Sequence, residues 1–168
     1  MDRAASAGSS TPATFNLLFV CTGNTCRSPM AEAIAREELA RRRWSHVRVA
    51  SAGVAAGVGA GAAQHARAVL GRRGIDLSGH ASQPLTPELV RWADVILAMG
   101  PSHLGPVAAA GGADKVALLG DFAAGAEGGG HPVADPYGGD EAEYEATLEQ
   151  LQSLIRRSLD RLAPILHP

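Results

Sequence analysis

The chain of 168 residues is poor in the side chains that define several large classes of protein. Aromatic residues make up 4% of it, so we expect tight packing of helices on a sheet instead of a core built on large rings. The two cysteines, Cys21 and Cys26, lie too close together to link distant parts of a fold. This excludes a disulfide framework and favours a reducing, cytoplasmic compartment.

Charged blocks and long apolar segments are also scarce. The formal net charge is −2, and the basic cluster at 41–43 is typical of a solvated helix end. We therefore expect neither nucleic acid nor a membrane surface as a partner. No apolar run approaches the length that spans a bilayer, and the run before Cys21 is too short for a secretory signal.

The length fits one domain with a buried core. Residues 1–14 are rich in Ala, Ser, Gly, Thr and Pro without periodicity, which is typical of a disordered tail. We place a single domain at 15–168.

The stretch VCTGNTCRSP at 20–29 has the features of an anion-binding loop. The apolar run at 15–20 predicts a buried strand before Cys21, and Pro29 suits the first turn of a following helix. The five residues between Cys21 and Arg27 are enough to curl around a tetrahedral anion with their N–H groups inward. The stretch predicts a phosphate-binding loop with a nucleophile at its floor.

Short apolar runs alternate with helical patterns along the rest of the chain. The other predicted strands are 47–51, 95–99 and 116–119, and the other predicted helices are 62–73, 86–92, 101–110 and 140–164. This alternation predicts an α/β fold with a doubly wound parallel sheet. Because such sheets bind ligands at the carboxyl ends of their strands, the loop after the first strand is well placed for a site.

Three residues suit hydrolysis of a phosphate ester or amide through an enzyme-bound intermediate. Cys21 is the nucleophile, and a helix N-terminus, inward N–H groups, Arg27 and the Ser28 hydroxyl all favour its thiolate. The planar guanidinium of Arg27 can hold two equatorial oxygens of the transition state. Asp135, on a turn stiffened by Pro136, is the best-placed acid for the leaving atom and the best-placed base for the attacking water.

These residues resemble the low-molecular-weight protein tyrosine phosphatase family, through Cys-x5-Arg-Ser-Pro near the N-terminus and Asp-Pro-Tyr near the C-terminus. The resemblance covers roughly residue 15 to the last helix. It implies a four-stranded parallel sheet flanked by helices on both faces, and a cysteinyl-phosphate mechanism without metal or other cofactor. On the matching positions Cys21 is the nucleophile, Arg27 the phosphate clamp and Asp135 the general acid, within a single phosphatase domain.

The resemblance also implies supporting roles. Asn24 matches a loop asparagine in a strained backbone conformation, a role that suits Asn because it tolerates positive φ. Its implied hydrogen-bond partners are Ser28, Ser51 and His80, with His80 structural instead of catalytic. The predicted substrate-binding and phosphate-binding residues are Thr22, Gly23, Asn24, Thr25, Cys26, Ser28 and Tyr137.

Within the family, the stretch from Cys21 and the Asp-Pro-aromatic-Gly-Gly motif are similar to the bacterial protein arginine phosphatases. Thr25 stands where tyrosine phosphatases usually carry Ile or Leu, and its hydroxyl offers an acceptor to a guanidinium. Gly138 stands where many tyrosine-specific members have a second aromatic residue. The arginine branch prefers Phe at the position of Tyr137. We predict a protein phosphatase acting on phosphoarginine, with phosphotyrosine as the alternative.

Other functions fit less well. Arsenate reductases of this fold pass oxidation to distal cysteines, but no cysteine follows Cys26. A phosphate-binding module without activity would not need Cys21, Arg27 and Asp135 together.

Cys26 itself has two open interpretations, a packing residue or a vicinal thiol that traps oxidised Cys21 as a disulfide. We expect a monomer that acts on a phosphorylated protein. The histidines other than His80 show no paired spacing and are expected to be incidental.

Overall fold

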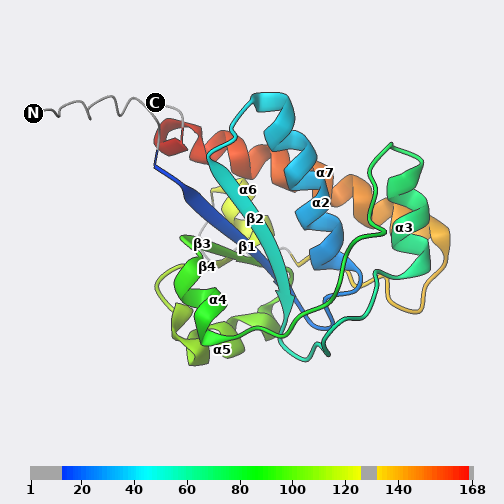
Figure 1. Cartoon of the computed structure of the whole chain (residues 1–168), viewed down its shortest axis with the longest axis horizontal. Coiled ribbons are helices and arrows are strands. Elements are labelled where there is room, and N and C mark those ends of the chain that lie inside the picture. Colours follow the sequence, from blue (N-terminus) through cyan, green and yellow to red (C-terminus); the bar gives the residue numbers. More distant parts are fainter. Residues whose placement is uncertain (1–12, 126–131, 167–168) are drawn as a thin grey trace, which may run out of the picture.

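A computed structural model of the chain describes residues 13–125 and 132–166 (Figure 1). The predicted tail at 1–14, except its last two residues, and most of the loop predicted at 125–134 lie outside the described residues. The described strands are β1 (Phe15–Cys21), β2 (Val47–Gly53), β3 (Val95–Ala98) and β4 (Val116–Leu118). They pair in parallel in the order β2-β1-β3-β4, which confirms the predicted four-stranded sheet.

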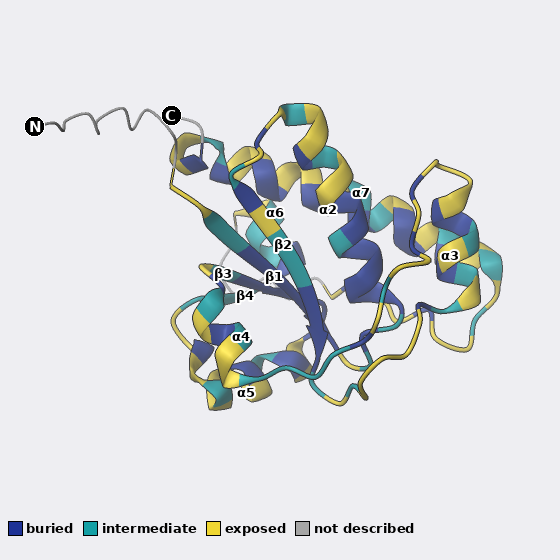
Figure 2. Cartoon of the chain, viewed as in Figure 1, coloured by how far each residue is buried: buried dark blue, intermediate teal, exposed yellow. Residues whose placement is uncertain are grey.

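Strand β1 is central and is covered on both faces. Leu17 and Phe19 pack into one hydrophobic cluster, whereas Leu18 and Val20 pack into another, because successive side chains of a strand point to opposite faces. These four side chains are at most 1% exposed (Figure 2). Double coverage explains why the run is continuously apolar instead of alternating.

Helices cover both faces of the sheet, as expected (Figure 1). The first cluster is completed chiefly by α2 (Arg27–Arg42), α3 (Gln64–Gly71) and α7 (Glu141–Leu166), and α6 (Leu119–Ala124) packs against α7. The second cluster contains α4 (Pro87–Trp92) and α5 (Leu104–Val107). The crossover from β1 to β2 runs through α2, so the amino terminus of α2 lies at the carboxyl end of β1.

Two predicted helix starts have the expected caps. Thr86 Oγ1 accepts a hydrogen bond from the Leu89 N–H at 3.2 Å, and Pro87 occupies the first turn of α4. Asp140 and Glu143 form a reciprocal capping box before α7, with N–H to carboxylate distances of 2.9 and 3.0 Å. Within the described ranges, no helix is long and apolar enough to cross a membrane.

The helix predicted at 101–110 is wrong as a single element. The chain forms a 3-10 turn η1 (Pro101–His103), the short α5, and a wide turn η2 (Ala108–Gly112). Glycine ends this region because Gly111 has a φ of 103°. A Cβ at Gly112 would lie 2.7 Å from Val107 Cγ1, so the close packing there also requires glycine.

Several other element boundaries also differ from the expectation. The helix predicted at 62–73 is shorter and spans Gln64–Gly71. The strand predicted to reach residue 119 ends at Leu118, because Leu119 begins the helix α6, which was not predicted. The last helix continues past Pro164 to Leu166. A proline so close to the end removes only one of the final intrahelical hydrogen bonds, so the helix persists for two more residues.

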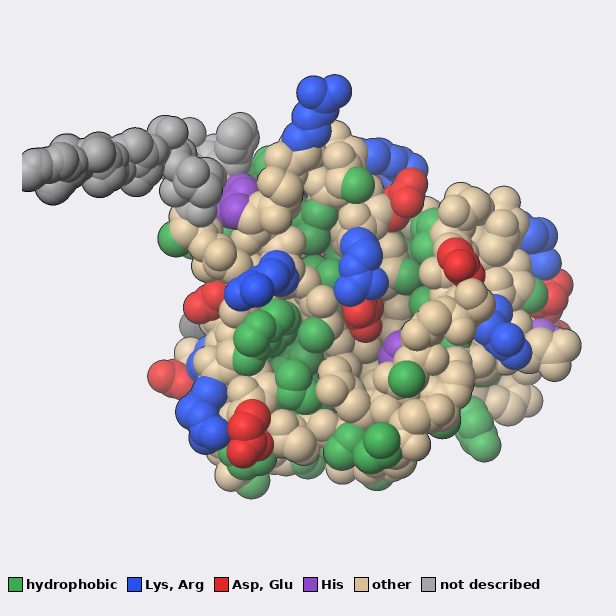
Figure 3. Space-filling model, in the orientation of Figure 1, with side chains coloured by type: hydrophobic (Ala, Val, Ile, Leu, Met, Phe, Trp, Pro, Cys, Tyr) green, Lys and Arg blue, Asp and Glu red, His purple; other side chains and the backbone are tan. Residues whose placement is uncertain are grey.

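Charges of both signs are mixed on the surface. Figure 3 shows basic and acidic side chains interspersed on the face in view. Charged side chains of opposite sign also form ion pairs, such as Arg36 with Glu32 at 2.7 Å and Arg72 with Glu141 at 3.0 Å. Ion pairs at a solvent-exposed surface contribute little to stability.

Candidate active site

The nucleophile candidate Cys21 is the last residue of β1, and its side chain is 3% exposed. Its Sγ lies 2.8 Å from Ser28 Oγ, in the first turn of α2. The Asn24 amide Nδ2 donates to the same Ser28 oxygen at 2.8 Å, so that oxygen is an acceptor for Asn24. The Ser28 hydroxyl keeps one proton, which can go to the Cys21 sulfur at 2.8 Å or to the Ala52 carbonyl at 3.5 Å, and the shorter contact favours the sulfur.

Asn24 is the centre of the hydrogen bonds that shape the loop. It is fully buried and has a φ of 56°. Its Nδ2 also donates to Ser51 Oγ at 2.9 Å, and its main-chain carbonyl lies 2.7 Å from His80 Nε2. The structure thus brings Ser28, Ser51 and His80 together around Asn24. A further contact was not anticipated, since Asn24 Oδ1 accepts from the Gln83 N–H at 2.9 Å.

Replacement of Asn24 tests how much this centre stabilises the fold. We expect Asn24→Ala to lower the free energy of unfolding by about 2 to 4 kcal/mol, because buried polar partners lose their bonds. Asn24→Gly should be less damaging by about 1 kcal/mol, since glycine adopts positive φ without strain. Urea unfolding measures both, with the exposed Gln64→Ala as control. A loss below about 0.5 kcal/mol for Asn24→Ala would contradict this interpretation.

The arginine and the acid candidate meet on the other side of the loop. Arg27 is 7% exposed, and its Nη1 donates to the Val133 carbonyl at 3.0 Å. Its Nη2 lies 3.5 Å from Asp135 Oδ2, on a carboxylate that is half exposed. The Val133 N–H donates to the Met99 carbonyl at 2.8 Å, just after β3. This pins the segment before Asp135 to the carboxyl edge of the sheet.

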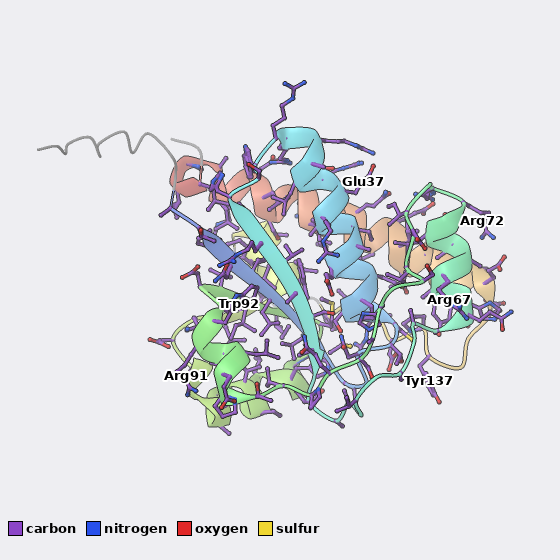
Figure 4. All side chains as sticks on the ribbon, viewed as in Figure 1. Glu37, Arg67, Arg72, Arg91, Trp92 and Tyr137 are labelled. Carbon is purple, nitrogen blue, oxygen red and sulfur yellow. The ribbon has the colours of Figure 1, made fainter. Side chains whose placement is uncertain are left out.

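These residues open onto a cavity of about 370 Å³. Its lining includes Cys21, Thr22, Gly23, Thr25, Cys26, Arg27, Asp135 and Tyr137 from the predicted set, together with Gly57, Ala60 and Ser82. Tyr137 is 77% exposed and projects outward at the rim (Figure 4). The side chains of Asn24 and Ser28, which also belong to the predicted set, are fully buried and are not part of this lining.

Cys26 lines the cavity and is otherwise buried, with its Sγ 3.2 Å from the Tyr144 hydroxyl of α7. Burial raises the pKa of the Cys26 thiol, and the hydrogen bond from Tyr144 opposes that shift only in part. Burial likewise raises the pKa of Tyr144 well above its ordinary value. At neutral pH both groups are therefore protonated, and Cys26 packs as a thiol against α7.

The expectation that His103 is incidental is wrong. His103 is 1% exposed, and its Nε2 lies 2.9 Å from Thr22 Oγ1 at the cavity wall. No motif marks this histidine, because its contact is made across 81 residues. One signal was present, since the residue follows β3, whose carboxyl end lies beside that of β1.

No group of three or more His, Cys, Asp and Glu side chains has a metal-binding arrangement in residues 13–125 and 132–166. The cavity instead combines a cysteine, a buried guanidinium, a carboxylate and the start of a helix. A helix N-terminus attracts anions, and a thiolate beside it can attack a phosphorus atom that this positive field holds in place. This arrangement defines a cysteine-dependent phosphatase site.

Comparison with known sequences agrees with this class. The family model for low molecular weight phosphotyrosine protein phosphatase matches residues 16–164, and the chain belongs to that family. A protein-arginine-phosphatase of Bacillus subtilis is 42% identical over 149 residues, which cover 88% of this chain and 96% of the relative. A probable low molecular weight protein-tyrosine-phosphatase, EpsP of Ralstonia nicotianae, is 36% identical over 88% of this chain and 93% of its own length.

Solved structures show the same fold. The YwlE arginine phosphatase from Geobacillus stearothermophilus superposes with a TM-score of 0.81 at 37% identity, covering 92% of this chain and 97% of the other. The tyrosine phosphatase AmsI of Erwinia amylovora gives a TM-score of 0.76 at 30% identity, over 88% and 92% of the two chains. The fold and family are therefore shared by enzymes named for two different phosphorylated residues.

Proposed function

We propose that this protein hydrolyses phosphoarginine in proteins, using Cys21 as nucleophile, Arg27 as phosphate clamp and Asp135 as general acid and base. The observation that carries the choice of substrate is Thr25 in the cavity wall. In the described part of the chain, its Oγ1 has only a long contact of 3.9 Å, to Cys26 Sγ. The hydroxyl is thus available as an acceptor for the N–H groups of a guanidinium.

The mechanism proceeds in two displacements at phosphorus. The Cys21 thiolate attacks the phosphorus, an S–P bond forms, and the P–N bond to the guanidinium breaks. Asp135 gives its proton to the departing nitrogen, so that arginine leaves in a stable form. Asp135 then takes a proton from a water molecule, whose oxygen attacks the phosphorus and breaks the S–P bond. Inorganic phosphate leaves and the thiolate is restored.

The loop stabilises the phosphoryl group throughout both displacements. The transition state of phosphoryl transfer spreads negative charge over three equatorial oxygens. Hydrogen-bond donors that already point at these oxygens stabilise that charge without having to reorient. Arg27 is preorganised because the Val133 carbonyl fixes one of its Nη atoms at 3.0 Å. The amino terminus of α2, which begins at Arg27, adds a partial positive charge.

Phosphotyrosine is the alternative substrate, because the same machinery serves either leaving group. The exposed ring of Tyr137 at the rim supports this alternative, since it can contact a phenyl ring. Against it, the wall at 53–61 carries no aromatic side chain to form the second side of a ring sandwich. Similarity supports phosphoarginine, because two arginine phosphatases are 42% and 39% identical to this chain, whereas two tyrosine phosphatases are 36% and 32% identical.

Substitution of Thr25 tests the choice of substrate. The wild type should have at least about tenfold higher kcat/KM on a phosphoarginine peptide than on the same peptide with phosphotyrosine. Thr25→Ile replaces the acceptor by an apolar surface and should shift that ratio toward phosphotyrosine by about tenfold or more. Steady-state kinetics on the matched peptides provide the measurement.

Thr25→Val is the matched control because it removes the hydroxyl at nearly constant volume. It should lose activity on phosphoarginine without the gain on phosphotyrosine that the longer isoleucine provides. If the wild type and Thr25→Ile prefer the same substrate to the same degree, the assignment to phosphoarginine is wrong.

We also infer that 15–168 works as one phosphatase domain, which the continuous sheet and the match at 16–164 support.

A further inference from the structure

His103 and Thr22 form a hydrogen-bonded pair beside the nucleophile that the mechanism above does not use. The His103 ring is buried, and its Nε2 lies 2.9 Å from Thr22 Oγ1. Thr22 directly follows Cys21 and lines the cavity. The pair therefore joins the loop after β1 to the turn η1 after β3, at the edge of the site.

A second hydrogen bond fixes which nitrogen of His103 carries the proton. The Gly100 N–H lies 3.0 Å from His103 Nδ1, and a main-chain N–H can only donate, so Nδ1 must accept. Burial and the positive charge of Arg27 lower the pKa of His103, and the carboxylate of Asp135 opposes that shift. The ring is neutral at pH 7, and its single proton lies on Nε2, facing Thr22.

The direction of this bond decides what the Thr22 hydroxyl can do. Its oxygen accepts from His103, so its own proton points elsewhere. Among the residues that the structure describes, Thr22 Oγ1 has no second hydrogen-bond partner. The free proton suits a ligand with acceptor oxygens, such as a phosphoryl group. A guanidinium carries only donors and does not match it.

We propose that His103 is a positioning residue that orients the Thr22 hydroxyl to donate a hydrogen bond to an oxygen of the bound phosphoryl group. The proposal rests on the proposed phosphatase function, but not on the identity of the leaving group. Thr22 touches the substrate, whereas His103 acts only through Thr22. The same effect is therefore expected with phosphoarginine, phosphotyrosine and inorganic phosphate.

Binding of inorganic phosphate tests the role of Thr22. Calorimetry gives its Kd, and competitive inhibition of p-nitrophenyl phosphate hydrolysis gives an independent Ki. Thr22→Val removes the hydroxyl at nearly constant volume and should weaken phosphate binding roughly tenfold. Thr22→Ser keeps the hydroxyl and should remain within about threefold of the wild type. Unchanged phosphate binding by Thr22→Val would overturn the proposal.

Two substitutions of His103 test its positioning role. His103→Gln places an amide N–H near the position of Nε2, whereas His103→Asn places a polar group near Nδ1 and cannot reach Thr22. We expect Asn to weaken phosphate binding roughly tenfold and Gln to restore most of that loss. The exposed Ser102→Ala, on the same turn, is the control and should match the wild type. If Asn and Gln bind phosphate as tightly as the wild type, His103 does not position Thr22.

The double variant Thr22→Val/His103→Asn separates positioning from packing. Because His103 acts through the hydroxyl that Thr22→Val has already removed, the double variant should bind phosphate within about twofold of Thr22→Val alone. Full additivity would mean that His103 only packs, and it would overturn the proposal. The proposal would also be overturned if the variants bound phosphorylated peptides more weakly but inorganic phosphate as tightly as the wild type, because Thr22 would then face the leaving group. A wild type that binds phosphate but hydrolyses neither peptide would reject the proposed function and not this one.

Discussion

Cys21→Ser is expected to lower kcat by about 10⁴-fold or more on any phosphorylated substrate. The serine hydroxyl keeps its proton at neutral pH, so the same position offers an alcohol in place of a thiolate. The surrounding donors, including Ser28 at 2.8 Å from the sulfur, are arranged for an anion and cannot remove that proton. The measurement is steady-state hydrolysis of a phosphoarginine peptide and of p-nitrophenyl phosphate, with substrate binding followed separately.

Cys26→Ser is the matched control for this loss. Its hydroxyl can keep a hydrogen bond to Tyr144, and the nucleophile remains in place. We expect its kcat to stay within about tenfold of the wild type. Cys21→Ser should still bind inorganic phosphate, because the loop N–H groups and Arg27 remain. If the two variants lose activity equally, Cys21 is not the single nucleophile.

Arg27→Lys is expected to lower kcat/KM by roughly 10² to 10³-fold, although the charge is conserved. A lysine offers a flexible point charge and cannot hold two phosphoryl oxygens in one plane. The guanidinium of Arg27 donates from Nη1 to the Val133 carbonyl at 3.0 Å and places Nη2 3.5 Å from Asp135 Oδ2. A lysine ammonium cannot make both contacts at once. The site would lose both its clamp and the contact that anchors the acid.

The exposed Arg67→Lys on α3 provides the control, since Arg67 is a surface residue that does not line the cavity. It should leave kcat/KM and thermal stability unchanged. Thermal unfolding of Arg27→Lys checks that the loss is catalytic and not a failure to fold. A kcat/KM within about threefold of the wild type would show that the fork geometry of Arg27 is not needed.

The parts of the fold that the sequence predicted are those encoded locally. The run at 15–20 is apolar throughout because β1 is buried on both faces, and the spacing of Cys21 and Arg27 depends on one short loop. The capping box of Asp140 and Glu143 likewise lies within four residues. Features of this kind can be predicted from a short stretch of sequence, because they do not depend on contacts with distant residues.

The parts that the sequence did not predict depend on distant neighbours. His103 contacts Thr22 across 81 residues, and Gln83 contacts Asn24 across 59, so neither pairing leaves a local pattern. The broken helix predicted at 101–110 runs into tight packing at Gly112, where a Cβ would lie 2.7 Å from Val107 Cγ1 and 3.1 Å from Val90 Cγ1 of α4. Tertiary packing there outweighs local propensity.

The long-range contacts of the site have a consequence for synthesis of the protein. Cys26 meets Tyr144 across 118 residues, and Arg27 meets Val133 across 106. Cys21 is thus synthesised well before Asp135 and the helix α7. Contacts of such wide separation carry a large loop-closure cost and form late in folding. A growing chain therefore carries Cys21 without an assembled site until the segment of Val133 and Asp135 and the helix α7 have been made.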